Sequence, residues 1–544
     1  MGRPVTTVES AAQDREATQG VRRRDRSTLA KGGALNLVGM GLYGALNFGL
    51  IVIVTRRLGA TGAGAFIEAI GVFNILTKTA LLGADTGLLR FVPQLRASHQ
   101  PEHLGQVFRT ALWPVVILGS LAGLLVFALA HPLADLISTR GGTAQLETYL
   151  RVMVPFIPAG AAYLVLESGA RSLGTMVPSL MVERIARPFL QPAAFLLVVS
   201  AGLGSVAVGL SWAAPTGLAL VPMAVWVVVL VRRARSVDRA AAGVELSPSP
   251  TVESSDLVRQ FWRFSVPRAF GGMFQVLVIW LDAILIGALA STREAGIYGA
   301  TTRWLIIGSF AAIAIMQAIG PQISYVLARR EQARAKHLFE VSTAWQILVA
   351  FPPYITVMVF APVLLKAFGT GFESGRSTLL ILGFANLFAA ACGPVEVVLL
   401  MTGRSTLNLI DSAISLAVNI GLNVLLVPSM GITGAAIAWA ASLFVSNAVP
   451  MIQVWTSTGL HPYGRIWGHA FVIGAAVAAA EGVAALLFGQ TLAGLLAGVA
   501  LASGTLVASL AYFRDELEIA DLLAAVRRRQ ARAQTGEAEM GLTP

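Results

Sequence analysis

The segment GALNLVGMGLYGALNFGLIVIVT, residues 33–55, contains no charged side chain. A helix needs roughly 17–25 predominantly apolar residues to cross the hydrocarbon core of a bilayer. This segment meets that requirement, and similar apolar stretches follow it almost without interruption. The sequence therefore predicts an all-α membrane protein. We place about fourteen transmembrane helices near residues 33–55, 63–82, 108–130, 150–173, 179–202, 206–231, 261–289, 296–319, 341–365, 377–401, 406–427, 431–454, 468–488 and 492–513,.

The composition of the whole chain agrees with this prediction. Of the 544 residues, 56% are hydrophobic and only 13% are charged, whereas about 25% of the residues in soluble domains are charged. The formal charge of +11 does not indicate a nucleic-acid partner, because the basic residues are spread between apolar blocks and are not gathered on one patch,. The single cysteine, Cys392, excludes an intramolecular disulfide bond,.

The distribution of Lys and Arg predicts the orientation. Cytoplasmic loops of membrane proteins hold an excess of these residues, and an even number of helices places both termini on one side. With both termini inside, about 30 of the 40 basic residues lie in the inside segments and about 7 in the outside segments,. We therefore expect a multi-pass protein with both termini in the cytoplasm.

The chain also shows an internal repeat. Ala63-Gly64-Ala65-Phe66 resembles Ala295-Gly296-Ile297-Tyr298, and four further short matches occur in the same order at offsets of 227 to 233 residues. A repeat of six helices keeps the same orientation in both copies, so the two halves are parallel and related by an axis along the membrane normal. Transporters built in this way bind substrate between their two lobes.

The repeat and the composition divide the chain into six parts. The longest inside connection contains Ser247-Pro248-Ser249-Pro250 and is typical of a flexible linker,. The predicted parts are a disordered cytoplasmic tail (1–28), an N-lobe (29–231), the cytoplasmic linker (232–260), a C-lobe (261–455), two additional helices (456–513), and a cytoplasmic amphipathic helix and tail (514–544).

Signatures of enzymes are weak or missing. None of the four lysines follows a glycine, so the sequence has no phosphate-binding Gly-Lys-Ser/Thr motif,. His99 to His103 match the letters of a zinc-protease motif, but Pro101 disfavours the continuous helix that such a motif requires,. The outside loops are too short for a catalytic domain. We therefore expect a transporter without a metal or an organic cofactor.

We single out five ionisable residues on the predicted transmembrane helices two, seven and eight. Such residues are costly in a bilayer and are therefore candidates for function. Arg303 and Asp282 lie at similar depth on adjacent helices, while Lys78, Arg268 and Glu68 lie elsewhere on helices two and seven. In the functional interpretation, the three cations attract an anionic headgroup, and Asp282 and Glu68 orient them or assist release. In the structural alternative, Asp282 pairs with Arg303, and Lys78 and Arg268 extend to the membrane interface.

Helix eleven has a polar face formed by Asn408, Asp411, Asn419 and Asn423. Such a face can bind a cation or join neighbouring helices by hydrogen bonds. The residues alone favour the packing role.

Several motifs resemble those of a known family. Trp280-Leu281-Asp282 and the segment from Ala295 to Arg303 are similar to motifs of the polysaccharide-type flippases (O-antigen and polysaccharide exporters) of the multidrug/oligosaccharidyl-lipid/polysaccharide exporter superfamily. Thr55-Arg56-Arg57-Leu58-Gly59 and the segment from Leu82 to Arg90 look like the corresponding motifs of the first repeat. The resemblance extends over roughly residues 30 to 515,.

This resemblance implies a V-shaped pair of six-helix lobes that works by alternating access in a bacterial cytoplasmic membrane. The implied substrate is an undecaprenyl-diphosphate-linked oligosaccharide, a cell-surface or exopolysaccharide precursor, moved from the inner to the outer leaflet. Arg303 and Lys78 resemble the cavity cations that meet the diphosphate in lipid II flippases. Because no basic residue lies between Lys31 and Arg56, an oligosaccharide or teichoic-type substrate is preferred over lipid II.

The same resemblance suggests further partners and an energy source. Membrane lipids and polysaccharide polymerase or assembly proteins are the implied partners, and Na⁺ or H⁺ coupling, with Asp282 and Asn419 as ligands, or the membrane potential would drive transport. The main alternative is a cation-coupled multidrug antiporter, in which Asp282 or Glu68 binds the exchanged ion. The cations Arg303, Lys78 and Arg268 disfavour this alternative because they would repel cationic drugs.

Overall fold

The computed structural model describes residues 6–98, 100–242, 254–514 and 516–517, and within them it is almost entirely helical. The first half contains α1 (Thr6–Ala80), α2 (Ala84–Ala97), α3 (Leu104–Ala128), α4 (Ala130–Ile137), α5 (Thr143–Met153), α6 (Ile157–Ser172), α7 (Val177–Ser179), the π-helical segment η3 (Leu180–Ala186), α8 (Arg187–Ser200), α9 (Ser205–Leu218) and α10 (Leu220–Ala242). The second half contains α11 (Ser254–Leu289), α12 (Thr292–Thr301), α13 (Ile306–Ala328), α14 (Gln332–Val359), α15 (Ala361–Leu365), α16 (Arg376–Cys392), α17 (Val395–Met401), α18 (Ser405–Met430), α19 (Ile432–Thr458), α20 (Arg465–Phe488) and α21 (Leu492–Tyr512). Short 3₁₀ turns η1 (Pro101–His103), η2 (Val154–Phe156), η4 (Thr302–Leu305), η5 (Lys366–Phe368) and η6 (Phe372–Gly375) connect them.

The predicted all-α membrane fold is confirmed. Eleven helical stretches of the described residues are long and apolar enough to cross a membrane. One of these stretches, Gly41–Ala97, includes both of the first two predicted helices, because α1 continues through a kink at Gly59 (φ 68°). The predicted helices near 179–202 and 296–319 are not among the eleven. The exact number of fourteen therefore stays a prediction.

The structure differs from the predicted domain boundaries in the polar segments. Helix α1 begins at Thr6, whereas the sequence predicts a disordered tail up to residue 28. The tail is rich in Ala, Glu, Gln and Arg, which favour helix, and it extends a helix that is already nucleated,. Helices α10 and α11 extend into the predicted linker from both sides, and only residues 243–253 lie outside the described residues. The predicted amphipathic helix lies almost entirely in residues 518–544, which are also outside them.

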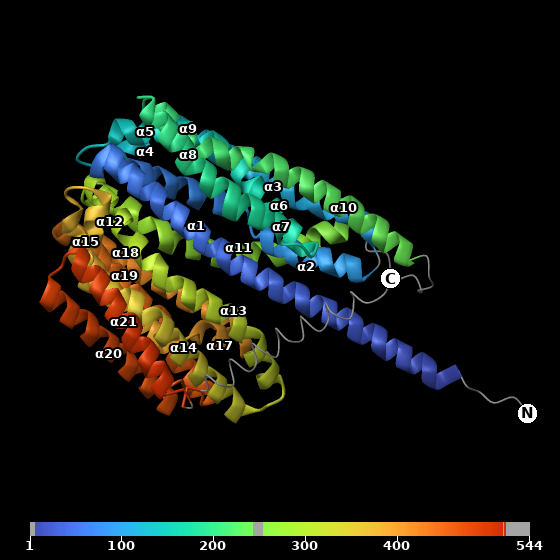
Figure 1. The fold of residues 1–544 in the computed structure, drawn as a ribbon. Helices are drawn as coiled ribbons and strands as arrows, with labels where there is room; N and C mark the ends of the chain where they lie inside the picture. The colour runs from blue at the N-terminus through green and yellow to red at the C-terminus, as the bar shows by residue number, and fades with distance from the viewer. Residues whose placement is uncertain (1–5, 99, 243–253, 515, 518–544) are drawn as a thin grey trace, which may run out of the picture.

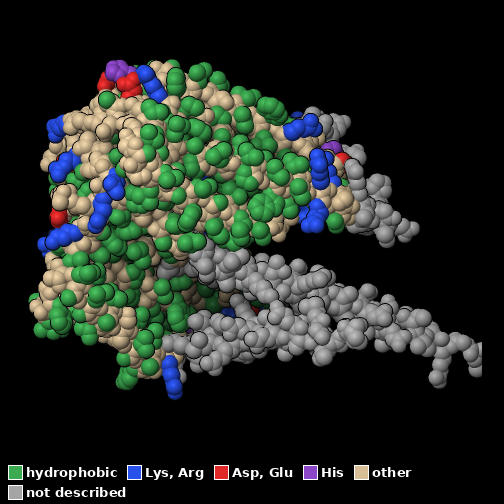
Figure 2. All heavy atoms as spheres, turned by 45° about the horizontal axis from the view of Figure 1, so that its top comes forward, with side chains coloured by type: hydrophobic (Ala, Val, Ile, Leu, Met, Phe, Trp, Pro, Cys, Tyr) green, Lys and Arg blue, Asp and Glu red, His purple; other side chains and the backbone are tan. Residues whose placement is uncertain are grey.

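The helices form two groups with α1 and α11 between them. Figure 1 shows α3 to α10 on one side, which we call the N-lobe, and α13 to α21 on the other, which we call the C-lobe. Figure 2 shows a band of hydrophobic side chains between two rims that carry Lys and Arg. Leucines such as Leu125, Leu197 and Leu486 are 60%, 70% and 86% exposed in this structure. These exposed side chains are those expected to face lipid.

Helix α11 belongs to both lobes. Leu257 and Phe261, near its beginning, lie in the hydrophobic core formed by α2, α3, α6 and α10. Ala283 and Ile286, near its end, lie in the core of the C-lobe with α12, α14 and α16. The N-lobe therefore does not end at residue 231, and the first half of α11 forms part of its core.

The repeat found in the sequence is visible in local contacts. The carboxylate of Glu167 accepts a hydrogen bond from Ser179, and that of Glu396 accepts one from Asn408. Both pairs are separated by 12 residues, and the two glutamates occupy equivalent positions in the repeat. Because the same contact forms at equivalent positions of the two repeats, the two halves share this local structure.

The two lobes touch most closely at Gly64 and Gly296, the pair that first indicated the repeat. A Cβ atom on Gly64 would lie 1.8 Å from the carbonyl oxygen of Thr292, and one on Gly296 would lie 2.0 Å from that of Ala60. Only glycine permits this backbone approach. Helices α1 and α12 therefore cross at equivalent positions, near the axis that relates the lobes.

Hydrogen bonds between the lobes surround this crossing. The N–H of Thr139 donates to the carbonyl of Gly287 (3.2 Å), and the N–H of Thr292 donates to that of Thr139 (3.3 Å). Arg56 Nε donates to the carbonyl of Ala367 (2.7 Å). We call this end of the bundle the closed end. Toward the other end, where α10 ends and α11 begins, the two lobes diverge (Figure 1). We call it the open end.

We expect Gly64→Val to separate the lobes at the closed end, because its Cβ would overlap the carbonyl of Thr292. The measurement is disulfide cross-linking of Ser138→Cys with Thr292→Cys in a Cys392→Ser background, since the two hydroxyl oxygens are 2.5 Å apart,. The valine should reduce the cross-linked fraction severalfold. Gly41→Val, on the same helix and facing open space, is the control. Equal cross-linking in both variants would refute the role of the glycine crossing.

Candidate functional site

Arg303 is a half-buried cation between the lobes. It lies in η4, and its guanidinium carbon is 5.5 Å from the centroid of the Trp280 ring on α11. Its buried Nε has no hydrogen-bond partner, and no carboxylate of the described residues lies within 4.0 Å. A guanidinium with free donors is suited to bind carboxylate or phosphate oxygens.

Asp282 does not pair with Arg303, so the structural alternative of an Asp282–Arg303 ion pair is wrong for this conformation. The carboxylate of Asp282 is only 2% exposed and lies inside the C-lobe. It accepts hydrogen bonds from the Tyr298 hydroxyl and from Asn423 Nδ2, both at 2.9 Å. Similar depth on adjacent helices did not lead to a contact because the donors of α12 and α18 satisfy this carboxylate.

Two amides beside Asp282 retain unpaired oxygens. Asn419 is fully buried beside Asp282, and its Oδ1 has no hydrogen-bond partner. The Oδ1 of Asn423 is also unpaired. Carboxylate and amide oxygens are the ligands that hard cations prefer. The structure therefore brings the two predicted cation ligands, Asp282 and Asn419, to one place and adds Asn423. Elsewhere in the described chain, no group of three His, Cys, Asp or Glu residues could hold a metal ion.

Glu68 does not join the other predicted site residues. It is fully buried at the closed end, and a Cβ on Gly287 would lie 2.2 Å from its Oε1. Neither carboxylate oxygen meets the criteria for a hydrogen bond. The crossing of α1 and α12 therefore encloses Glu68, and its role in binding substrate stays a prediction.

Lys78 and Arg268 lie closer to the open end. Lys78 Nζ forms an ion pair with Asp85 Oδ2 at 2.7 Å, so its charge is already compensated. Arg268 is exposed, and its guanidinium carbon lies 3.9 Å from the centroid of the Phe264 ring. The sequence did not predict the partner Asp85, because it follows the helix break at Gly83.

A charged network in the N-lobe was not singled out by the sequence analysis. Arg187 NH1 donates to Glu183 Oε2 at 2.9 Å, and both residues lie at the π-helical segment η3. Tyr43 of α1 lies within electrostatic range of Arg187, Glu183 and Arg303. Glu183 and Arg187 are charged residues within the predicted helix 179–202, and this position could have marked them as candidates. The π-helical segment is a second indication, because such segments are frequent at functional sites.

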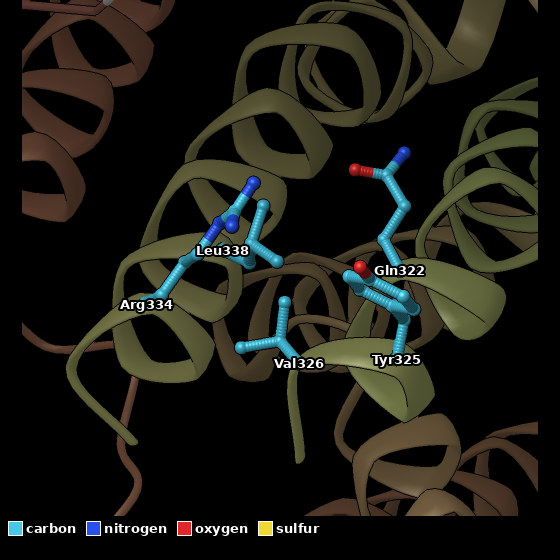
Figure 3. Close-up of a pocket in the computed structure, with 5 residues that line it drawn as sticks. All are labelled: Gln322, Tyr325, Val326, Arg334 and Leu338. Carbon is cyan, nitrogen blue, oxygen red and sulfur yellow. The ribbon is translucent and has the colours of Figure 1, made fainter. Parts of the chain in front are cut away.

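A small surface pocket lies apart from this region. It is lined by Gln322, Tyr325, Val326, Arg334 and Leu338 of α13 and α14 (Figure 3) and has a volume of about 240 Å³. Arg334 already pairs with Glu331 at 3.2 Å, and the Tyr325 hydroxyl accepts a hydrogen bond from Arg329. The pocket is therefore a less suitable binding site than the space between the lobes.

Comparison with known proteins supports the same architecture. Residues 37–196 match the family described as MatE. The structure of the lipid II flippase MurJ in an inward closed conformation is similar to this chain, with a TM-score of 0.65 and 12% sequence identity. The alignment covers 88% of this chain and 99% of the MurJ chain. The structure of an inward-facing multidrug resistance transporter of the MATE family and MOP superfamily is also similar, with a TM-score of 0.64 and 14% sequence identity. This alignment covers 77% of this chain and 94% of the transporter chain.

One curated relative is a probable low-salt glycan biosynthesis flippase, Agl15, from Haloferax volcanii. It is 25% identical over 201 residues, which are 37% of this chain and 42% of the relative. The chain thus spans about two fifths of that protein's length. Together these likenesses give the chain the fold of the MOP-superfamily membrane transporters, with a MatE match in its first lobe. This is a fold of transporters and not of enzymes.

We expect Tyr298→Phe to destabilise the C-lobe, because it removes one of the two donors to the buried Asp282 carboxylate. A buried acceptor that loses its donor costs about 1–3 kcal/mol. Thermal unfolding of the purified protein in detergent measures this loss. Tyr325→Phe, at an exposed tyrosine, is the control and should change stability by less than about 0.5 kcal/mol,. Equal effects of the two substitutions would show that the hydrogen bond to Asp282 does not stabilise the lobe.

Proposed function

We propose that this protein is a flippase that moves an undecaprenyl-diphosphate-linked oligosaccharide from the inner to the outer leaflet by alternating access. The observation that carries this proposal is Arg303, a cation between the lobes with free donors and no carboxylate partner. A diphosphate supplies the oxygens that such a guanidinium lacks. The sugar groups would occupy the remaining space between the lobes.

The comparisons support the proposal at two points. The Haloferax volcanii relative is named as a probable glycan biosynthesis flippase, and one solved structure with this fold is a lipid II flippase. The lobes diverge toward the end that the Lys and Arg distribution predicts to be cytoplasmic (Figure 1). Membrane lipids would surround the lobes, and polysaccharide polymerase or assembly proteins would receive the product.

The membrane potential would favour export of such a substrate. A diphosphate carries about two negative charges, and each gains about 2.3 kcal/mol on crossing an inside-negative potential of 100 mV toward the outside. About 4.6 kcal/mol is then available without a coupling ion. Cation coupling through Asp282, Asn419 and Asn423 would add to this driving force.

The alternative is a cation-coupled multidrug antiporter. The unpaired oxygens beside Asp282 favour it, because they could bind the exchanged ion, and one solved structure with this fold is a multidrug resistance transporter. The unpaired cations Arg303 and Arg268 disfavour it, since they would repel a cationic drug. The cation site fits both functions, whereas the unpaired arginines fit only an anionic substrate.

We expect Arg303→Gln to reduce transport of the lipid-linked glycan roughly tenfold or more, because a hydrogen bond to a charged group contributes about 1.5–3 kcal/mol. The measurement is the amount of diphosphate-linked oligosaccharide that accumulates on the inner leaflet of cells that lack the wild-type protein. Arg303→Lys should restore transport in part, because it keeps the charge and loses the bidentate geometry.

Arg109→Gln, at an exposed position on α3, is the matched control and should transport normally. If cells without the protein accumulate no such lipid and change only in drug sensitivity, the antiporter is the correct function. If the lipid accumulates and Arg303→Gln clears it as well as wild type does, Arg303 does not bind the headgroup.

We expect Asp282→Asn to abolish any dependence of transport on Na⁺ or on a proton gradient, because the site then loses its only carboxylate. Transport into proteoliposomes is compared in Na⁺ and in choline buffers, and with and without a pH gradient. Asp135→Asn, at an exposed residue of α4, is the control. Unchanged ion dependence in the Asp282 variant would exclude this site as the point of coupling.

A further inference from the structure

Arg90 and Arg268 share one aromatic ring near the open end. The guanidinium carbon of Arg90 lies 4.2 Å from the centroid of Phe264, and that of Arg268 lies 3.9 Å from it. The two carbons are therefore at most about 8 Å apart,. Both side chains are exposed, and no carboxylate of the described residues lies within 4.0 Å of either. The fold thus holds two like charges on one aromatic ring without a paired carboxylate.

The ring that carries the two arginines is fixed by packing. Phe264 meets Phe91 edge to face at 6.0 Å, and Phe91 packs against the fully buried Phe261 at 5.5 Å. Gly87 allows α2 to lie directly on α11, since a Cβ there would be 2.3 Å from Ser265 Oγ. This contact positions the two arginines on the ring before any ligand binds, which lowers the entropy lost on binding.

We propose that Arg90, Phe264 and Arg268 form a loading site for the phosphate groups of an anionic lipid headgroup. Each guanidinium can donate to phosphate oxygens, so a headgroup with one or more phosphates meets two cationic groups on a single ring. The phosphates come from one of two sources, the diphosphate of the transported glycolipid or the headgroup of an anionic membrane lipid. The first source rests on the proposed function.

The position of the loading site suggests its role. One turn after Arg268, a Cβ on Gly272 would lie 3.4 Å from Lys78 Cε, and further along the same helix Trp280 carries Arg303. Twelve residues of helix separate positions 268 and 280, or about 18 Å. Along α11 from the open end, the loading site therefore precedes Arg303, which lies deeper toward the closed end.

The site is present in only one lobe. The repeat aligns Pro93-Gln94 with Pro321-Gln322, which places Ala318 at the position equivalent to Arg90. The repeat copy of this position therefore has no cation. A headgroup that enters between the lobes would meet the phosphate ligands on the wall formed by α2 and α11.

The test is ligand binding to the full-length protein in phosphatidylcholine nanodiscs. One arm titrates inorganic pyrophosphate, and the other measures retention of phosphatidylglycerol by native mass spectrometry. We expect Arg90→Gln and Arg268→Gln each to weaken binding about tenfold in at least one arm, and the double variant to lose less than the product of both effects. Arg259→Gln, at an exposed residue of the same helix paired with Asp256, is the control and should bind as wild type does.

Weaker pyrophosphate binding assigns the site to the diphosphate of the substrate, and a loss confined to phosphatidylglycerol assigns it to a membrane lipid. Arg90→Lys keeps the charge and should retain part of the binding, which separates lost recognition from misfolding. Wild-type binding by both glutamine variants in both arms overturns the proposal. Because binding needs no transport, a protein that binds pyrophosphate through Arg90 but exports no glycan keeps the loading site and loses the proposed function.

Discussion

The close approach of two backbones at Gly64 and Gly296 is the contact on which the arrangement of the lobes depends. A side chain at either position would overlap a carbonyl oxygen of the other lobe. The two glycines are equivalent in the repeat, so the crossing of α1 and α12 lies near the axis that relates the halves. The hydrogen bonds of Thr139 with Gly287 and Thr292 form around this crossing. Since the lobes are fixed there, they diverge at the opposite end, and the space between them opens on one side only.

The charged groups in this structure fall into two kinds with different consequences. Asp282 is buried inside the C-lobe and satisfied by Tyr298 and Asn423, while Lys78 and Asp85 neutralise each other. Arg303 and Arg268 instead rest on aromatic rings without a carboxylate partner. An aromatic ring stabilises a cation without neutralising it. The space between the lobes therefore keeps a positive potential even though the chain places several acidic residues near it. Cations that are not neutralised suit the anionic substrate that we propose.

The sequence predicted the fold better than it predicted the contacts within the site. Apolar length and the repeat sufficed for an all-α membrane protein with two lobes, because both depend on residue spacing alone. The ionic pairing of Asp282 with Arg303 was wrong, since depth along two helices does not specify which faces meet, and donors from α18 decided the outcome. Asp85 and the pair of Glu183 with Arg187 were missed because helix breaks at Gly83 and η3 displaced them from the regular pattern. Contacts across a kink or a π-helical segment depend on local backbone geometry, which periodicity does not contain.

Helix α11 contributes residues to the hydrophobic cores of both lobes, and it therefore joins the two halves. Leu257 and Phe261 are core residues of the N-lobe, although the chain reaches them only after the long connection that follows α10. The lobes are thus held together by the packing of α11 into the N-lobe as well as by the peptide chain that connects them. If the polypeptide were severed between Ala242 and Ser254, the second fragment would still carry the helix that completes the first fragment's core. Two separately synthesised halves would then recognise each other through this helix, and the connection itself could vary in length and sequence without loss of assembly.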